Sequence, residues 1–119
     1  MNRIVAAYTS LFSNYANTTG RMSRLNYWCA ELAHIVVWIL LGMVDGALFQ
    51  TALIPGIYLL LMLFPILAAT VRRLHDTGKG AAYLLLCFVP ALGVIILFVF
   101  LCQAGTNGMN RFGLPDSLQ

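Results

Sequence analysis

Three short clusters of polar residues in this chain contain residue types that can do chemistry. The first has the pattern G-R-x-S-R-x-x-Y-W over residues 20–28, and the second reads R-R-L-H-D-T-G-K over residues 72–79. The third reads G-T-N-G-M-N-R-F-G over residues 105–113. Arginine and lysine suit phosphate groups, and the His-Asp step in the second cluster invites comparison with metal-dependent phosphohydrolases. These three clusters are therefore the candidate sites.

The His75-Asp76 pair by itself is weak evidence for a metal site. A metal site needs three or four ligands, and the other histidine, His34, lies inside an apolar run. Glu31 and His34 are three residues apart, so they share a helix face, and a cluster of these two residues with His75 and Asp76 is conceivable. We favour a role for Asp76 in capping its turn and pairing with an arginine of the first or second cluster. With no G-x-S-x-G motif and no P-loop, we expect no catalytic residue, metal or cofactor.

The basic residues of the first two clusters have two interpretations, lipid binding and plain topology-setting charge, and we favour the second for these residues taken alone. Arg21, Arg24, Arg72, Arg73 and Lys79 would lie at one membrane surface, where each contributes about 1 kcal/mol to the binding of anionic lipid head groups. The alternative is that these charges only set the topology. The net charge of +3 is divided among short segments between apolar runs, which is unlike a phosphate-binding stripe, so we expect no nucleic acid.

The elements that must position these clusters are apolar runs of membrane-spanning length. Hydrophobic residues make up 61% of the 119 residues and charged residues 9%, whereas a soluble domain has about 25% charged residues. Twenty helical residues measure about 30 Å, the thickness of the hydrocarbon core. The sequence therefore predicts an all-α membrane protein with one domain over residues 1–119. Its predicted parts are an amphipathic helix over 2–17, three transmembrane helices over 26–49, 52–71 and 81–102, and a polar tail over 103–119.

The third run has two readings, because Pro90 and Gly93 fall at its centre. It is either one kinked spanning helix, or it is broken or re-entrant between Pro90 and Gly93, which requires that protein bury the break. With three spans, six basic residues lie on one side and Arg111 on the other. A re-entrant run brings all seven to one side. Both readings place the N-terminus in the cytoplasm.

Three ionisable residues, Glu31, His34 and Asp45, interrupt the first apolar run. Such groups are costly, at about 2.5 kcal/mol or more for an aspartate at the centre of the bilayer, so they usually face protein or water. They could line an ion or proton path in an oligomer. We favour Asp45 as a group that reaches the outer interface, and we expect Glu31 to meet Arg72 or Arg73 near the cytoplasmic end.

The order and spacing of the three clusters resemble the DUF805 family of small bacterial inner-membrane proteins. That family shows G-R-x-S-R-x-x-Y-W before its first span, R-R-L-H-D-T-G between later spans and G-x-x-G-x-N-R-[YF]-G in its tail. The resemblance covers roughly residues 12–116, with departures at Thr19 and at Ala82-Tyr83, where the family often has aromatic residues. The resemblance implies a location in the bacterial inner (plasma) membrane. It supplies no reaction, because the function of the family is not established.

Three hypotheses for function follow. The first is a non-enzymatic membrane protein that binds a partner protein or anionic phospholipid through a basic cytoplasmic face. The second is an oligomeric channel or transporter subunit that uses Glu31, His34 and Asp45, and the third is a membrane-embedded enzyme at His75 and Asp76. The expected partners are the lipid bilayer, anionic phospholipid, a second copy of the chain or a membrane partner protein. The predicted site comprises Arg21, Ser23, Arg24, Arg72, Arg73, His75, Asp76 and Lys79, with the tail residues Gly105, Gly108, Asn110, Arg111, Phe112 and Gly113.

Overall fold

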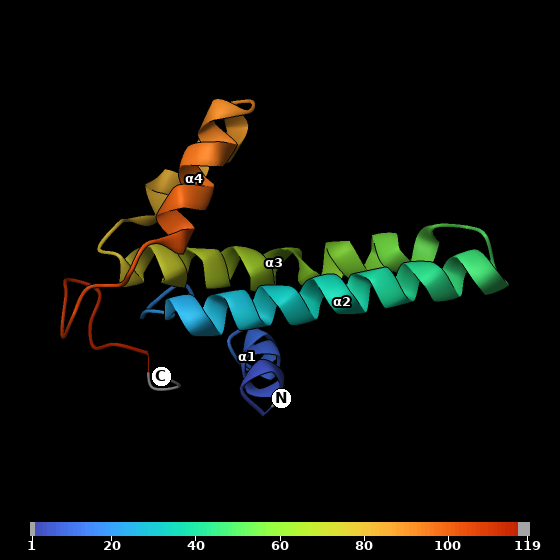
Figure 1. Ribbon diagram of the computed structural model, residues 1–119, viewed down its shortest axis with the longest axis horizontal. Helices are drawn as coiled ribbons and strands as arrows, with labels where there is room; N and C mark the ends of the chain where they lie inside the picture. Colours follow the sequence, from blue (N-terminus) through green and yellow to red (C-terminus); the bar gives the residue numbers. More distant parts are fainter. Residues whose placement is uncertain (1, 117–119) are drawn as a thin grey trace.

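The computed structural model describes residues 2–116, and this part of the chain is built from helices (Figure 1). The predicted tail over 103–119 is irregular as far as residue 116, with an isolated bridge between Asn110 and Gly113, and residues 117–119 lie outside the described residues. The helices are α1 (Asn2–Ser13), α2 (Arg24–Leu48), α3 (Leu53–Asp76), the 3-10 helix η1 (Ala81–Phe88) and α4 (Leu92–Cys102).

Helices α2 and α3 form a long antiparallel hairpin, and both are long and apolar enough to cross a membrane. Their turn is closed by Asp45, whose carboxylate accepts hydrogen bonds from the Thr51 hydroxyl (2.7 Å) and the Ala52 amide (2.5 Å). The same carboxylate accepts from the Thr51 amide (3.2 Å), so two amide groups at the turn that would otherwise lack partners are satisfied. The first two predicted spans are therefore present as helices. Helix α3 continues to Asp76, five residues beyond the predicted end of the second span at residue 71, so the first part of the second cluster is helical.

The run predicted as a third span is divided into two short helices. Helix α4 has 11 residues and measures about 17 Å, too short for a hydrocarbon core of about 30 Å. The break falls at residues 89–91, where Ala91 has a φ of 59°. At Gly93 a Cβ atom would collide with the Leu86 carbonyl, so glycine allows η1 and α4 to pack closely. The described chain therefore has two candidate spans, and the predicted three-span arrangement is not found.

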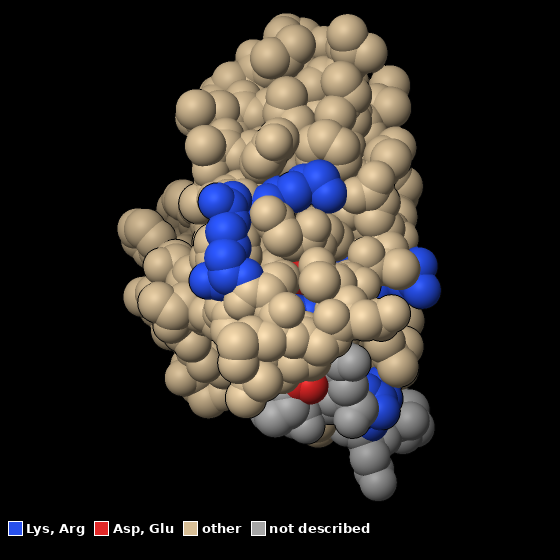
Figure 2. Space-filling model, turned by 90° about the vertical axis from the view of Figure 1, so that its left-hand side faces the viewer, with Lys and Arg blue, Asp and Glu red and all other residues tan. Residues whose placement is uncertain are grey.

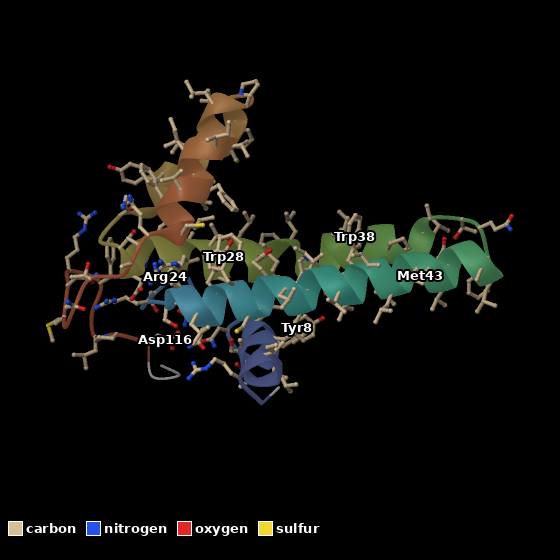
Figure 3. All side chains as sticks on the ribbon, in the orientation of Figure 1. Tyr8, Arg24, Trp28, Trp38, Met43 and Asp116 are labelled. Carbon is tan, nitrogen blue, oxygen red and sulfur yellow. The ribbon has the colours of Figure 1, made fainter. Side chains whose placement is uncertain are left out.

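The N-terminal helix is present but four residues shorter than predicted, since it ends at Ser13. Helix α1 crosses the α2–α3 hairpin and buries Ala7 and Leu11 against it. The Tyr8 and Tyr58 hydroxyls share a hydrogen bond of 2.9 Å at this crossing. Figure 3 shows Tyr8 at the crossing, with Met43 much farther along α2. Helix α1 therefore braces only one part of the hairpin.

Candidate functional site

The three polar clusters meet at the end of the α2–α3 hairpin where α2 begins (Figure 1). The Met22 amide donates to the Arg72 carbonyl (3.0 Å), which joins the first cluster to the second. The Thr106 amide donates to the Asp76 carbonyl (2.7 Å), which joins the tail to the second cluster. We call this assembly of Arg21, Arg73 and Asp76 with tail residues 103–113 the polar junction.

Asp76 is the centre of the polar junction. Its Oδ1 accepts from Arg21 at 2.9 Å and its Oδ2 from Arg73 at 2.8 Å, and all three side chains are buried. This confirms the expectation that Asp76 pairs with an arginine of the first or second cluster. Two guanidinium groups share one carboxylate, so one positive charge is left over. Buried ions persist only when their remaining donors are also satisfied.

Backbone carbonyls satisfy those remaining donors. The Arg21 guanidinium donates to the carbonyls of Thr106 (2.6 Å) and Gly108 (2.5 Å) in the tail. The Arg73 guanidinium donates to the Leu101 carbonyl (3.0 Å) at the end of α4, and to the Gln103 carbonyl. Both arginines therefore hold the chain that follows α4 against the beginning of α2.

Gly105 lets the tail pass directly over the Asp76 carboxylate. A Cβ atom at residue 105 would collide with that carboxylate, so a side chain there would force the two apart. The glycine content of the third cluster predicts a tight loop, and the close approach of Gly105 to Asp76 gives the physical reason for one of its glycines.

The other members of the second cluster are also held in tertiary contacts. His75 Nδ1 lies 3.0 Å from the Gly20 carbonyl, and the His75 ring stacks on Phe112 with centroids 3.8 Å apart. The Asn110 side chain donates to the His75 carbonyl (2.9 Å). Arg72 is buried and donates to the Asn17 carbonyl (2.6 Å). The structure thus places Arg72 and His75 inside the polar end of the molecule, packed against other segments.

Ser23 lies at the beginning of α2. It is the N-cap residue, and its hydroxyl accepts from the Asn26 amide at 3.2 Å. Ser23 is itself buried, and its own amide donates to Asp116 (3.0 Å). Its role is therefore to begin the helix and to hold the tail.

The cations that remain at the surface are fewer than the predicted face contains. Arg24 and Arg111 are exposed and Lys79 is partly exposed, while Arg21, Arg72 and Arg73 are buried. Figure 2 shows Lys and Arg side chains on the surface of this end, separated by uncharged residues. The predicted basic face is therefore corrected to its accessible members in the clusters, Arg24, Lys79 and Arg111.

These surface cations make few contacts with the rest of the protein. Arg24 donates to the Cys102 carbonyl (3.3 Å), and Arg111 lies over the Phe112 ring. Lys79 donates to the Gln103 side chain (2.7 Å). Partial burial lowers the pKa of the Lys79 ammonium, and the nearby positive charge of Arg73 lowers it further.

The ionisable residues of the first apolar run do not form one group. Asp45 lies at the far turn, while His34 Nδ1 bonds the Tyr58 hydroxyl (2.9 Å) near the crossing of α1. Glu31 makes no ion pair with Arg72 or Arg73, contrary to expectation, and its buried Oε1 has no hydrogen-bond partner among the described residues. Over residues 2–116 the conceivable metal cluster of Glu31, His34 and the His-Asp pair does not form.

Two residues that the sequence reading did not single out help to fasten the junction. Asn26 is almost fully buried, and its amide group donates to Asp116 (2.9 Å) while its carbonyl oxygen accepts from Arg3 (3.0 Å). Asn26 lies inside the first cluster, so a polar residue at the beginning of an apolar helix was an available signal. Asp116 follows the third cluster, and nothing in its local sequence marks it.

Comparison with known proteins agrees with this arrangement of motifs. Residues 15–114 match a family described as a protein of unknown function, DUF805. The chain is 38% identical over 107 residues to the inner membrane protein YhaI of Escherichia coli (strain K12), which covers 89% of this chain and 91% of the relative. It is 41% identical over 114 residues to the inner membrane protein YhaH of the same strain. This match covers 92% of this chain and 93% of the relative. No solved structure matches.

Proposed function

This chain belongs to the DUF805 family, and we propose that it is a non-enzymatic inner-membrane protein that holds anionic phospholipid at a basic cytoplasmic face. Its relatives YhaI and YhaH are inner membrane proteins, and its two long apolar helices suit the same location. The observation that carries the proposal is the gathering of accessible cations, Arg24, Lys79 and Arg111, at one end of the hairpin.

The distribution of charge supports the orientation. All seven lysine and arginine residues lie on or beside the polar junction, and none lies at the Asp45 turn. Cytoplasmic segments next to membrane helices carry an excess of these residues. We therefore place the N-terminus and the described part of the tail in the cytoplasm, with two spans between them and η1–α4 as a hairpin that enters and leaves from the same side.

The apolar surface beside these cations favours a lipid over a partner protein. No residue of η1 is buried, and Phe88 at its end is 78% exposed. A hairpin of this composition suits contact with acyl chains, and the phosphates of the same lipids would then lie at the level of Arg24 and Lys79. Each basic residue near an anionic surface contributes about 1 kcal/mol of attraction.

The contacts made by the residues of the two rival hypotheses, the enzyme and the channel, also support binding. Asp76 is fixed by two guanidinium groups and His75 is stacked and hydrogen-bonded, so neither is poised for a reaction. Asp45 is used in the far turn, well separated along α2 from Glu31 and His34, which disfavours a continuous path of ionisable groups.

The test is the lipid that accompanies the purified protein. Native mass spectrometry would count phosphatidylglycerol bound to the wild type, to the R24Q/K79Q/R111Q triple variant and to a charge-retaining R24K/K79R/R111K control. We expect the neutral variant to lose about fivefold in retention per cation removed, and the control to resemble the wild type. The loss should shrink at high salt, since exposed charges are screened. Equal retention by all three proteins would contradict the proposal.

A further inference from the structure

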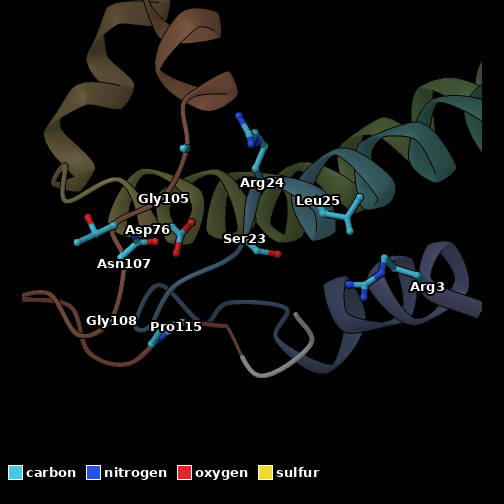
Figure 4. A pocket seen from close by; sticks show the side chains of 11 residues that line it. Arg3, Ser23, Arg24, Leu25, Asp76, Gly105, Asn107, Gly108 and Pro115 are labelled. Carbon is cyan, nitrogen blue, oxygen red and sulfur yellow. The ribbon is translucent and has the colours of Figure 1, made fainter.

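We infer that His75 is a pH-sensitive latch, which holds a turn of the tail against the end of α3 and loosens that turn when its imidazole is protonated. The turn comprises residues 110–113, and we call it the tail turn. The latch acts within the chain, so it goes beyond the proposed function and requires no lipid. Figure 4 shows the path of the tail toward this turn, which passes Asp76 at Gly105 and continues to Gly108.

The tail turn is a closed unit that carries Phe112. The Asn110 amide donates to the Gly113 carbonyl (3.1 Å), and the Gly113 amide donates to the Asn110 carbonyl (3.0 Å). The side-chain oxygen of Asn110 accepts from the Phe112 amide (2.8 Å). Gly113 has a φ of 114°, which glycine adopts without strain, so the turn can close in this way. Phe112 is therefore presented by a turn whose own hydrogen bonds fix its shape.

His75 joins the tail turn to the other two clusters. Its ring stacks on Phe112 with the planes 3° apart and the centroids 3.8 Å apart, and its carbonyl accepts from the Asn110 side chain (2.9 Å). Its Nδ1 lies 3.0 Å from the Gly20 carbonyl in the first cluster. His75 is only 7% exposed. A change of charge on this ring therefore acts on segments of all three clusters.

The contact with Gly20 shows where the ring can gain a proton. A carbonyl oxygen only accepts, so Nδ1 carries the hydrogen of the neutral ring and Nε2 is the nitrogen that becomes protonated. Histidine is the side chain whose unperturbed pKa places its change of charge between about pH 5 and pH 8. The latch therefore responds in that range.

The surroundings of the ring disfavour its charged form. Burial removes an ionised imidazole from water, and His75 makes no ion pair among residues 2–116. Arg111 already lies over the Phe112 ring, with its guanidinium carbon 4.6 Å from the centroid. The segments that surround His75 contain six other charged residues. They are Arg21, Arg72, Arg73, Asp76, Lys79 and Asp116.

The two carboxylates in this set already have partners. Asp76 is shared by Arg21 (2.9 Å) and Arg73 (2.8 Å), and Asp116 accepts from the Ser23 amide (3.0 Å) and the Asn26 side chain (2.9 Å). With Arg111, these segments hold five cations against two carboxylates. A proton on His75 increases this excess, and the repulsion falls when the tail turn moves away with its arginine.

Protonation shifts an equilibrium and does not free the whole tail, because Arg21 also donates to the Gly113 carbonyl (3.2 Å). An imidazole released from these contacts has the ordinary pKa of about 6.5. The docked turn is therefore most favoured above that pH and becomes less favoured as the pH falls below it. A single proton changes the docking equilibrium by at most about tenfold per pH unit.

The test follows a nitroxide spin label on Met109→Cys, next to the tail turn, in the full chain with its three native cysteines replaced. Electron paramagnetic resonance in detergent micelles gives the mobile fraction of the label between about pH 8 and pH 5. The chain has two histidines, so NMR of the imidazole-labelled protein follows His75 and His34 separately.

We expect the mobile fraction to rise as the pH falls, with a midpoint that coincides with the titration of His75. The ratio of mobile to docked label should change by no more than about tenfold per pH unit. An unchanged label spectrum while the NMR signal shows that His75 has become protonated would overturn the latch, and this comparison requires no variant of the histidine.

Two variants remove the titration in different ways. H75F keeps an aromatic ring against Phe112, and H75Q keeps an N–H donor for the Gly20 carbonyl. H34Q removes the other histidine and is the matched control. We expect H34Q to retain the pH-dependent rise in mobility, and H75F and H75Q to abolish it. A rise that persists in both His75 variants would assign the response to another group and refute the latch.

Discussion

The two ends of the α2–α3 hairpin are held together in different ways. At the polar junction, α1, α4 and the tail surround the helices, and Leu74 and Arg73 are completely buried. At the far end most apolar side chains point outward, and Leu53 is 62% exposed. There the hairpin is fastened by Asp45 and the turn that it caps.

This difference shows that a row of charges beside membrane helices has two distinct uses. Arg21 and Arg73 bind Asp76 and the carbonyls of the tail, so they fix one segment of the chain against another. Arg24 and Lys79 remain at the surface, where a ligand can reach them. Substitutions at the two ends should therefore have very different effects on stability.

The largest expected effect is that of Asp76→Ala. Removing this carboxylate leaves the Arg21 and Arg73 guanidinium groups buried without a counter-charge, and we expect a loss of about 3–5 kcal/mol in the free energy of unfolding. Asp45→Ala removes a carboxylate from the far turn that pairs with no cation among residues 2–116, and should cost only about 1–3 kcal/mol. Denaturant unfolding in detergent micelles measures both values, and equal losses would contradict the contrast between the two ends.

A matched pair of leucines on α3 tests the same contrast without charge. Leu74→Ala removes a fully buried side chain at the polar junction and should cost about 2–5 kcal/mol. Leu53→Ala makes the same chemical change at the far end, where the side chain is 62% exposed, and should stay within about 0.5 kcal/mol of the wild type. Similar losses for both variants in micelles would mean that the far end is packed against protein in solution.

A smaller effect is expected from Gly105→Ala, which places a methyl group against the Asp76 carboxylate. The forced shift should cost about 1–3 kcal/mol. Gly56→Ala is the control, because a Cβ atom on this residue of α3 meets nothing within 4 Å. Alanine is the better helix former, so that variant should be neutral or slightly more stable in the same unfolding assay. A Gly105→Ala protein as stable as the wild type would show that the tail does not lie over Asp76.

Run length and helix signals predict much of this fold. Both candidate spans are found within five residues of their predicted limits. The third run is ambiguous, because 22 apolar residues are as suitable for one span as for two short helices in a hairpin. In the structure the run is broken, and Arg73 holds the end of α4 beside α3 through the Leu101 and Gln103 carbonyls, a contact that the sequence does not reveal.

The candidate site is predictable in its members but less so in their roles. The three clusters and the pairing of Asp76 with arginine follow from residue types. The burial of Arg21, Arg72 and Arg73 does not, because most of their acceptors are backbone carbonyls, which leave no mark in the sequence. Glu31 was expected to meet Arg72 or Arg73, but Arg72 donates to the Asn17 carbonyl and Arg73 pairs with Asp76.

The central claim is that the tail joins the first two clusters at one face of the membrane. It is tested by introducing Met109→Cys or Gln50→Cys into a chain whose three native cysteines are replaced, since Met109 is 69% exposed in the tail and Gln50 lies at the far turn. A membrane-impermeant maleimide should label the residue-50 variant in spheroplasts and the residue-109 variant only in inverted vesicles. Labelling of both variants in spheroplasts would place the tail on the far side and contradict the account.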